Sequence, residues 1–466
     1  MIGMWKYLAL RKLGAVFLET LLLMCCVLAA YWVRMQEWPL GLNAIEQYHI
    51  LYKAILIALV FQLSLHLNDI YNFQYTQALR EYIIRLTQAL FMATLVLSVI
   101  FFVNPVLVVG RGIFILSLIF SAAFLIIWRT LLRMYFGKRH PSTNLIVLGT
   151  GTLARDAVKE ILRRPDLGIR VLGFVDDSPQ LLGVSIINPK VIGNYEDLPK
   201  LVADHKVARI IVGLPDRRGK LPIKDLLDLK TRGVAIEEVA TFYERVAGKI
   251  PLENLKPSWM VFNSGFTVSK QLLIEKRIIS IGASFLLMLL FSPVILLLMA
   301  LIKLDSKGPV FYRQERVGQD GKIFVLWKFR SMVADAEVNT GPVWSDGTEK
   351  DPRITRIGRF MRRNRLDELP QLWNVFKGDM SFVGPRPERP NFVQQLTETI
   401  PFYSLRHIVK PGITGWAQIN YTYANTLDQA MEKLQYDLFY VKNMSWILDA
   451  LIMFETVKTV LVKKGS

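Results

Sequence analysis

Four long apolar runs occupy the first part of the chain. They lie at about residues 13–33, 51–67, 87–103 and 112–131. Each is long enough, or nearly so, to cross about 30 Å of hydrocarbon as a helix that rises about 1.5 Å per residue. The pattern therefore predicts a four-helix transmembrane bundle, although the third run also fits a buried helix of a soluble domain.

Positive charge is unevenly distributed around these runs. Lysine and arginine precede the first run, separate the second from the third and follow the fourth, at Lys6, Arg11, Lys12, Arg80, Arg85, Arg129, Arg133, Lys138 and Arg139. The other two connections carry few of them. By the positive-inside tendency, we expect the N-terminus and everything after residue 135 in the cytoplasm. No small-residue cleavage pattern lies close to the first run, so it is predicted to stay attached.

The pattern changes after residue 142 to that of a soluble α/β domain. Residues 144–148 read as a buried strand, 149–154 as a glycine turn, 154–164 as a helix, and 171–175 as a second strand that ends in acids. This order is typical of a Rossmann-like crossover. A lone Gly-x-Gly-x-x-Ala motif is weak evidence of binding, so two alternatives stay open. The domain either binds no ligand or binds a nucleotide through Gly149, Gly151 and Asp176.

A fifth apolar stretch, residues 278–302, is interrupted by Ser292-Pro293. Its length alone favours a transmembrane helix. Proline removes an intrahelical hydrogen bond near mid-depth, serine can satisfy a freed backbone group, and basic residues flank both ends. The sequence therefore predicts a re-entrant helix that bends at Ser292-Pro293. Residues 444–464 carry apolar positions at helical spacing broken by charges, which predicts an amphipathic interfacial helix.

Composition agrees with a membrane setting and a phosphorylated ligand. The 466 residues are 52% hydrophobic, with mean hydropathy +0.31, formal net charge +18 and pI near 9.7. Such a cationic surplus suits anionic lipid head groups or phosphates, and no nucleic-acid motif accompanies it. The two cysteines, Cys25 and Cys26, lie side by side in an apolar run, which excludes a disulfide framework or a zinc site.

Two adjacent carboxylates, Asp367 and Glu368, follow a run of arginines at Arg353, Arg356, Arg359, Arg362 and Arg363. On a helix, Arg363 would lie one turn before Asp367. A rigid Pro385-Arg386-Pro387 turn follows 19 residues after Asp367. Arginines can neutralise phosphate charge while one acid holds a divalent metal and the other attacks phosphorus or takes a proton. An isolated acid pair is also compatible with ordinary surface ion pairs on a solvated helix.

Further motifs surround this pair in order: Gly308-Pro309-Val310-Phe311-Tyr312-Arg313, Lys328-Phe329-Arg330-Ser331-Met332 and Lys410-Pro411-Gly412-Ile413-Thr414-Gly415-Trp416. Together they resemble the bacterial sugar transferases, the monotopic polyprenol-phosphate sugar-1-phosphate transferases, from about Lys270 to the C-terminus. The resemblance implies transfer of a sugar 1-phosphate from a UDP-sugar to undecaprenyl phosphate, with release of UMP. It also implies a bacterial inner membrane location with the catalytic domain on the cytoplasmic face, and it is compatible with a homodimer.

The resemblance also implies roles for individual residues. Asp367 matches the family's nucleophile, which forms a phosphosugar-aspartyl intermediate, and Glu368 matches the acid that helps to hold Mg²⁺. Arg362 matches a phosphate-binding arginine, and Arg386 one near the nucleotide base. Lys328 and Arg330 match conserved basic positions. Arg363 joins the substrate-binding candidates because of its place in the arginine run.

The predicted organisation is a multi-domain membrane protein. It has a four-helix transmembrane domain at 1–138, a Rossmann-like domain at 142–248, a linker at 249–269 and a mainly α monotopic catalytic domain with a re-entrant helix at 270–466. The alternatives are a membrane-bound nucleotide-sugar dehydratase or epimerase and a non-catalytic nucleotide sensor. Dehydratases and epimerases of this kind use a Tyr-x-x-x-Lys pair, and this chain has none between residues 142 and 260. A nucleotide sensor would leave the acid pair without a role. The motifs specify neither the sugar nor the polysaccharide pathway.

Overall fold

The computed structural model describes residues 4–39, 41, 49–71, 79–137, 143–214, 221–254, 265–267, 269–333, 353–421 and 426–461. The chain forms two compact units, Met1–Phe242 and Tyr243–Ser466. The predicted boundary between the first two domains, at residues 138–142, lies outside the described residues.

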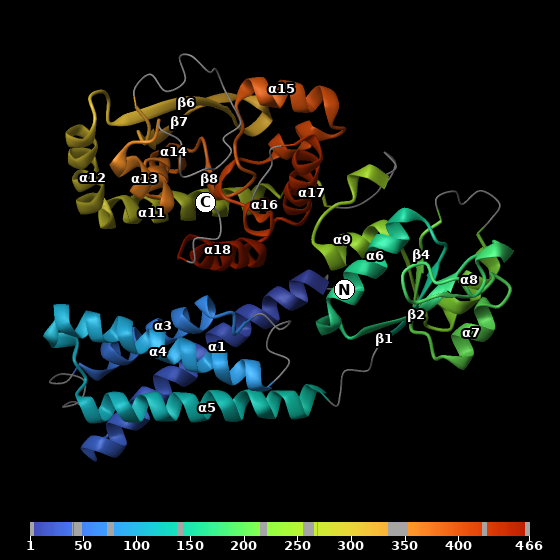
Figure 1. Cartoon of the computed structure of the whole chain (residues 1–466), viewed down its shortest axis with the longest axis horizontal. Helices are drawn as coiled ribbons and strands as arrows, with labels where there is room; N and C mark the ends of the chain where they lie inside the picture. The colour runs from blue at the N-terminus through green and yellow to red at the C-terminus, as the bar shows by residue number, and fades with distance from the viewer. Residues whose placement is uncertain are drawn as a thin grey trace. The chain divides into compact units, whose positions relative to one another are not determined.

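The first unit begins with four long helices (Figure 1), α1 (Met4–Met35), α3 (Ile50–Leu67), α4 (Leu79–Val103) and α5 (Arg111–Gly137). α1 packs against α3 and α5, and α3 packs against α4. Within the described ranges, these four helices are long and apolar enough to cross a membrane. Large apolar side chains such as Phe17, Phe91 and Ile119 remain exposed on them. The predicted four-helix bundle is confirmed, and the protein is a membrane protein.

A buried polar cluster lies inside this bundle. Glu19 of α1 is fully buried, and its carboxylate lies 3.2 Å from the Arg129 guanidinium of α5. Tyr71 donates a hydrogen bond to Glu19 and accepts one of 2.7 Å from Gln62 of α3. Arg129 was expected to follow the fourth membrane helix, but α5 continues to Gly137 and places Arg129 inside it. Because a lone charge in hydrocarbon is costly, the pair ties α1 to α5.

The rest of the first unit is an α/β domain built on a five-stranded sheet in the order β3-β2-β1-β4-β5, with all neighbouring strands parallel. The strands are β1 (Thr143–Leu148), β2 (Ile169–Val175), β3 (Val191–Gly193), β4 (Arg209–Val212) and β5 (Ala235–Glu238). Helices α7 (Leu198–Asp204) and α8 (Ile223–Thr231) pack on one face of the sheet, and α6 (Thr152–Arg163) covers the other (Figure 1). The predicted Rossmann-like topology is confirmed.

Helix α9 (Val239–Ala247) crosses the boundary between the two units. Its Glu244 accepts hydrogen bonds of 2.6 Å from Lys442 and 2.9 Å from Asn443. Just beyond it, Lys249 pairs with Glu432 at 2.7 Å. The second unit therefore starts before residue 248, where the Rossmann-like domain was predicted to end.

After α9, the second unit continues with α11 (Lys270–Leu290) and α12 (Ser292–Asp305), which are bent by 60° at a break that contains Phe291. Pro293 has no N–H to continue the α11 ladder, and the Ser292 hydroxyl donates to the Leu289 carbonyl at 2.7 Å. The predicted break at Ser292-Pro293 is thus present, with the predicted role for serine. Whether both ends lie on one side of the membrane remains a prediction.

The remainder of this unit is mainly helical, as predicted. Its strands are the antiparallel pair β6 (Phe311–Val317) and β7 (Ile323–Phe329) and the parallel pair β8 (Ser381–Val383) and β9 (Gly412–Thr414). Its helices include α13 (Arg356–Arg363), α14 (Gln371–Lys377), α15 (Pro390–Thr399), α16 (Trp416–Asn420), α17 (Leu427–Asn443) and α18 (Trp446–Leu461). Leu298 and Ile302 of α12 pack against Phe329 and Met361, which joins the bent helix to the rest of the unit.

Helix α18 departs from a simple amphipathic helix. Asp449, expected among its polar positions, is buried and pairs with Lys276 of α11 at 2.7 Å. Tyr440 also donates to the Asp449 carboxylate at 2.8 Å. The spacing of apolar residues could not show this, because the partner of Asp449 lies more than 170 positions earlier in the chain.

Candidate active site

The acid pair lies in a short 3₁₀ helix, η6 (Leu366–Glu368), and not on a continuation of α13. α13 ends at Arg363, and Arg365 adopts the left-handed conformation with φ of 56°. The expected one-turn relation between Arg363 and Asp367 is therefore wrong, and Arg363 is exposed. A non-glycine residue with positive φ interrupts a helix, and here it separates α13 from the short helix that carries the acids.

Helix α14, directly after the acids, is held from two sides. The buried Asn374 side chain donates to the Val325 carbonyl at 2.7 Å and accepts from the Trp327 N–H at 3.0 Å, which fixes α14 to β7 next to Lys328. From α11, Arg277 donates to the carbonyls of Val375 and Phe376 at 2.7 and 2.8 Å. A cation at the C-terminal end of a helix satisfies free carbonyls and the helix dipole. The helix that follows the acid pair is thus attached both to the β6–β7 hairpin and to α11.

Glu368 is surrounded by three cations. Its Oε1 lies 2.7 Å from Arg386, 3.3 Å from Lys328 and 3.9 Å from Arg365. Burial alone would raise the pKa of Glu368, but the charges of Arg386 and Lys328 outweigh burial and hold this pKa well below its usual range. Glu368 is therefore ionised at every physiological pH.

Asp367 has a different environment. It is 8% exposed, and within the described part of the chain no hydrogen bond or close ion pair engages its carboxylate. Burial raises the pKa of Asp367, the positive charge of Lys328 opposes that rise, and the charge of Glu368 adds to it. Glu368 is thus bound directly by cations, whereas Asp367 has no direct partner among the described residues but lies near the same positive charges. Such a carboxylate is suited to attack an electrophile.

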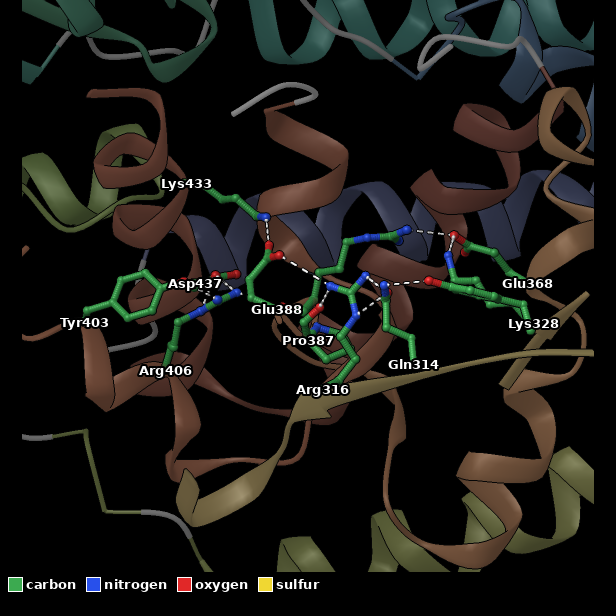
Figure 2. A network of polar contacts seen from close by, with 12 residues as sticks. Gln314, Arg316, Lys328, Glu368, Pro387, Glu388, Tyr403, Arg406, Lys433 and Asp437 are labelled. Atoms are coloured by element: carbon green, nitrogen blue, oxygen red, sulfur yellow. Dashed lines mark hydrogen bonds and ion pairs between the residues drawn. The ribbon is translucent and has the colours of Figure 1, made fainter. Parts of the chain in front are cut away.

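The loop that carries Arg386 is held by two further arginines through its backbone. Arg406 donates to the Arg386 carbonyl at 2.8 Å, and Arg316 donates to the Pro387 carbonyl at 2.9 Å. Figure 2 shows the resulting network, which runs from Arg406 at one end to Glu368 and Lys328 at the other. Fixing two successive carbonyls sets the direction in which the Arg386 side chain leaves the loop, toward Glu368.

Each of these two arginines has an acidic partner. Arg406 of η7 (Tyr403–Ile408) pairs with Asp437 at 2.7 Å, and both side chains are 2% exposed. Arg316 lies 3.5 Å from Glu388, which also accepts a 2.6 Å bond from Lys433. Burial alone would raise the pKa of Glu388, but Lys433 and Arg406 lower it to about 2. No sequence motif pointed to Arg406, Asp437 or Lys433, because their partners are remote in sequence.

The remaining predicted basic residues take different places. Arg362 donates through Nε to the Ser331 hydroxyl at 2.8 Å, and its charge acts on Asp367, which puts it in the same positive field. Arg330 is buried and donates to the carbonyls of Ser306 and Lys307, at the end of α12. That contact occupies the Arg330 guanidinium in a structural role, and its substrate-binding role remains a prediction, as does that of Arg363.

The glycine turn of the Rossmann-like domain is formed as expected. Gly149 has φ of +92°, a conformation that requires glycine, and Gly151 precedes α6. The Asp176 carboxylate accepts a 2.8 Å bond from the Thr150 hydroxyl and a 3.1 Å bond from the Ser178 N–H. Asp176 thus stabilises its own turn, and a nucleotide at this turn remains a prediction.

A magnesium ion would have to be held mainly by the acid pair. Within the described residues, no group of three or more His, Cys, Asp or Glu side chains is arranged to hold a metal. Mg²⁺ often binds one or two carboxylates together with substrate phosphates and water. Glu368 and Asp367 are such a pair, so the donor set fits Mg²⁺ when a phosphorylated substrate supplies further oxygens.

Comparison with known proteins agrees with these features. Residues 270–463 match the model of the bacterial sugar transferase family, and residues 66–236 match that of a CoA-binding domain. A UDP-N-acetylgalactosamine-undecaprenyl-phosphate N-acetylgalactosaminephosphotransferase of Aeromonas hydrophila is 40% identical over 233 residues, which are 50% of this chain and 54% of the relative.

Two relatives align over more of the chain. The UDP-glucose:undecaprenyl-phosphate glucose-1-phosphate transferase of Escherichia coli (strain K12) is 34% identical over 351 residues, 73% of this chain and 74% of the relative. The undecaprenyl-phosphate glucose phosphotransferase of Komagataeibacter xylinus is 33% identical over 335 residues, 70% and 61% of the two chains. The chain thus spans about half to three quarters of these relatives. The matched catalytic unit and these long alignments show that the chain belongs to the family of bacterial sugar transferases.

Proposed function

We propose that the chain is a phosphoglycosyl transferase that moves a sugar 1-phosphate from a UDP-sugar to undecaprenyl phosphate and releases UMP. The observation that carries this proposal is the unlike pair of acids, Glu368 held by three cations and Asp367 left without a direct partner beside it. The names of the relatives support the donor and acceptor classes.

The reaction proceeds in two displacements at one phosphorus atom. First, an Asp367 carboxylate oxygen attacks the phosphorus that carries the sugar, a P–O bond to UMP breaks, and UMP leaves with that electron pair. Second, a phosphate oxygen of undecaprenyl phosphate attacks the same phosphorus and the bond to Asp367 breaks, which returns the carboxylate and forms the lipid diphosphate sugar. A covalent relay lets two bulky anions react one after the other.

The cations around the pair have distinct roles in this scheme. Arg386 and Lys328 neutralise Glu368 in the free enzyme, and both can also contact phosphate oxygens of the donor. Arg362 adds positive charge on the Asp367 side, where negative charge builds up on the equatorial oxygens. Bound Mg²⁺ would supply further neutralisation of the phosphates. Arg316 and Arg406 keep the Arg386 loop in place.

Lys328 gives a test of Asp367 through pH. Because the positive charge of Lys328 opposes the raised pKa of Asp367, we expect Lys328→Gln to raise that pKa further. At a given pH less Asp367 is then ionised, so the acidic limb of the rate profile should move to higher pH. The measurement is the rate of the first displacement as a function of pH, monitored through the release of UMP. Lys322→Gln, an exposed lysine of the same hairpin, is the control and should leave the profile in place. An unmoved limb in Lys328→Gln contradicts the assignment.

We also propose that the enzyme lies in the bacterial inner membrane with its catalytic unit in the cytoplasm, where nucleotide sugars are made. A re-entrant α11–α12 pair keeps both ends on that side, and the 60° bend supports it. The exposed apolar side chains of α11, including Phe285, Leu286 and Leu289, provide the lipid-facing surface.

Cysteine labelling in intact cells tests this topology. In a variant without Cys25 and Cys26, single cysteines at Lys270 and Asp320 should both be protected from an impermeant thiol reagent added outside, and both should react after permeabilisation. Because a straightened helix can reach the far side, Pro293→Ala is expected to increase outside labelling at position 320 and to lower activity. Labelling at 320 but not 270 in the unaltered helix would show a full crossing.

The donor sugar is open, since the relatives are named for N-acetylgalactosamine and for glucose. A panel of UDP-sugars assayed with undecaprenyl phosphate and Mg²⁺ should give UMP and a lipid-linked sugar phosphate with at least one donor. UMP should also form in one burst, close to one per enzyme, when the acceptor is withheld. Transfer without such a burst would exclude the aspartyl intermediate. A homodimer and a ligand in the Rossmann-like domain remain predictions.

A further inference from the structure

A cavity of about 240 Å³ lies in the second unit beside the first half of α11. Its walls come mainly from α11, from β8 and from the segment just before β9, with Met444 added from the connection between α17 and α18. They are mostly apolar, with Val383 and Val409 among them. Two further wall residues of α11, Ile274 and Ile278, are 61% and 65% exposed. These two isoleucines continue the exposed apolar side of the membrane helix. The cavity therefore adjoins the surface expected to meet lipid.

Three cationic side chains line this cavity, and two of them are already bound. Lys276 pairs with Asp449 and donates to Tyr440, and Arg277 donates to the carbonyls at the end of α14. Lys410 is different: across the described ranges, no hydrogen bond or ion pair involves its ammonium group. Burial lowers the pKa of Lys410, the nearby charge of Arg277 lowers it further, and the charge of Asp379 opposes them only in part. An anion in the cavity would offset the remaining effect.

The chemistry of the cavity matches a phosphate attached to a hydrocarbon chain. An ammonium group in a mostly apolar wall binds a phosphate well because the low dielectric strengthens the attraction. The exposed isoleucines would lie along the chain that leads away into the membrane. A soluble nucleotide sugar has no long apolar part to place there, so these walls favour a lipid ligand.

The segment that carries Lys410 packs against the segment that leads to Arg386. The Gly412 N–H donates to the Pro385 carbonyl at 3.0 Å, and the Ser381 N–H donates to the Pro411 carbonyl at 2.8 Å. The two segments are so close that a Cβ on Gly384 would lie 2.3 Å from the Lys410 carbonyl oxygen. A lipid phosphate at Lys410 would thus lie beside a segment packed against the loop of Arg386, the residue that binds Glu368. This proximity to the acid pair favours a reactant over a bulk membrane lipid.

We propose that this cavity receives the polyprenol phosphate acceptor, with Lys410 binding its phosphate and Ile274 and Ile278 contacting its first isoprene units. The assignment rests on the proposed function, because it names the acceptor site of that reaction. Lys410 is a substrate-binding residue in this scheme, whereas Lys276 and Arg277 line the cavity with their charged groups already bound to other residues.

The test measures acceptor binding without turnover. Full-length protein in lipid nanodiscs is incubated with undecaprenyl phosphate and no UDP-sugar, and bound lipid is measured by native mass spectrometry. We expect Lys410→Gln to weaken binding by about tenfold or more and Lys410→Arg to retain most of it. Lys377→Gln is the matched control, because Lys377 is exposed and pairs with Asp379, whose charge also acts on Lys410, but does not line the cavity. In assays, Lys410→Gln should raise the KM for the acceptor and leave that for the UDP-sugar unchanged.

Unchanged undecaprenyl phosphate binding by a folded Lys410→Gln protein would overturn the proposal. The proposal would also be overturned if Lys410→Gln lost co-purified phosphatidylglycerol but kept its binding of undecaprenyl phosphate. The cavity would then hold a membrane phospholipid and not the acceptor. Wild-type protein that binds the acceptor in a Lys410-dependent way, yet releases no UMP with any donor, would refute the proposed reaction and support the lipid-phosphate site.

Discussion

Asp367→Asn is expected to lower transfer by roughly a thousandfold or more while the protein still folds, because the amide keeps the size of the side chain but loses the nucleophilic charge. Folding should survive, since within the described residues no ion pair or hydrogen bond depends on this carboxylate. The acceptor-free burst of UMP should disappear as well. The measurement is UMP release under single-turnover conditions, which separates loss of the first displacement from loss of the second.

Asp320→Asn is the matched control for this variant. Asp320 is exposed, lies in the same unit and has φ of 55°, a conformation that asparagine tolerates. Its activity should stay within about twofold of the wild type, since it contacts none of the charged groups described above. A folded Asp367→Asn enzyme with an intact burst would assign the covalent step to another residue. In that case Glu368 would be the next to examine.

Much of the architecture could be predicted because it depends on local patterns. The apolar runs predicted the four membrane helices, and the strand–glycine–helix pattern around Gly149 predicted the parallel sheet. Ser292-Pro293 predicted the break between α11 and α12. Each of these features depends on residues that are close together in the sequence, so spacing alone indicates them.

The details of the active site depend on contacts that spacing does not encode. The arginine run predicted a helix that carries Arg363 to Asp367, but the left-handed Arg365 ends that helix, and Arg386 reaches Glu368 from another segment. Arg330 shares a motif with Lys328, and two positions apart in one strand their side chains would share a face. β7 ends at Phe329, however, and just beyond that end Arg330 binds the Ser306 carbonyl while Lys328 pairs with Glu368.

The residues that position the site were the hardest to predict. Asn374, Arg316 and Arg406 act on backbone carbonyls or N–H groups of other segments, and backbone atoms carry no sequence signature. Lys276 and Asp449 looked like a basic flank and a polar helix position, but the fold brings them together in a buried pair. When only sequence neighbours are considered, a charged residue is predicted to face solvent, and only the tertiary structure shows whether it has a buried partner.

The second large effect is expected at Arg406. Arg406→Leu leaves the carboxylate of Asp437 buried without its cation, and removing one partner of such a pair costs about 3–5 kcal/mol of unfolding free energy. Tyr403 loses its contact with the Arg406 guanidinium, and the Arg386 carbonyl loses a donor. Chemical unfolding of the detergent-solubilised protein, followed by tryptophan fluorescence, measures the loss. Lys377→Leu breaks the exposed pair with Asp379 and should change stability by at most about 0.5 kcal/mol.

The double variant Arg406→Leu/Asp437→Leu separates stability from positioning. With both charges gone, the unpaired buried carboxylate is removed, so most of the lost stability should return. The Arg386 carbonyl still lacks its donor, so Arg316 alone holds the loop and kcat should stay well below the wild type. KM for the UDP-sugar should change less, because Lys328 and Arg362 still provide positive charge near the acids. Recovery of kcat together with stability would show that Arg406 only holds the fold, and that the direction of Arg386 is set by Arg316 and the loop itself.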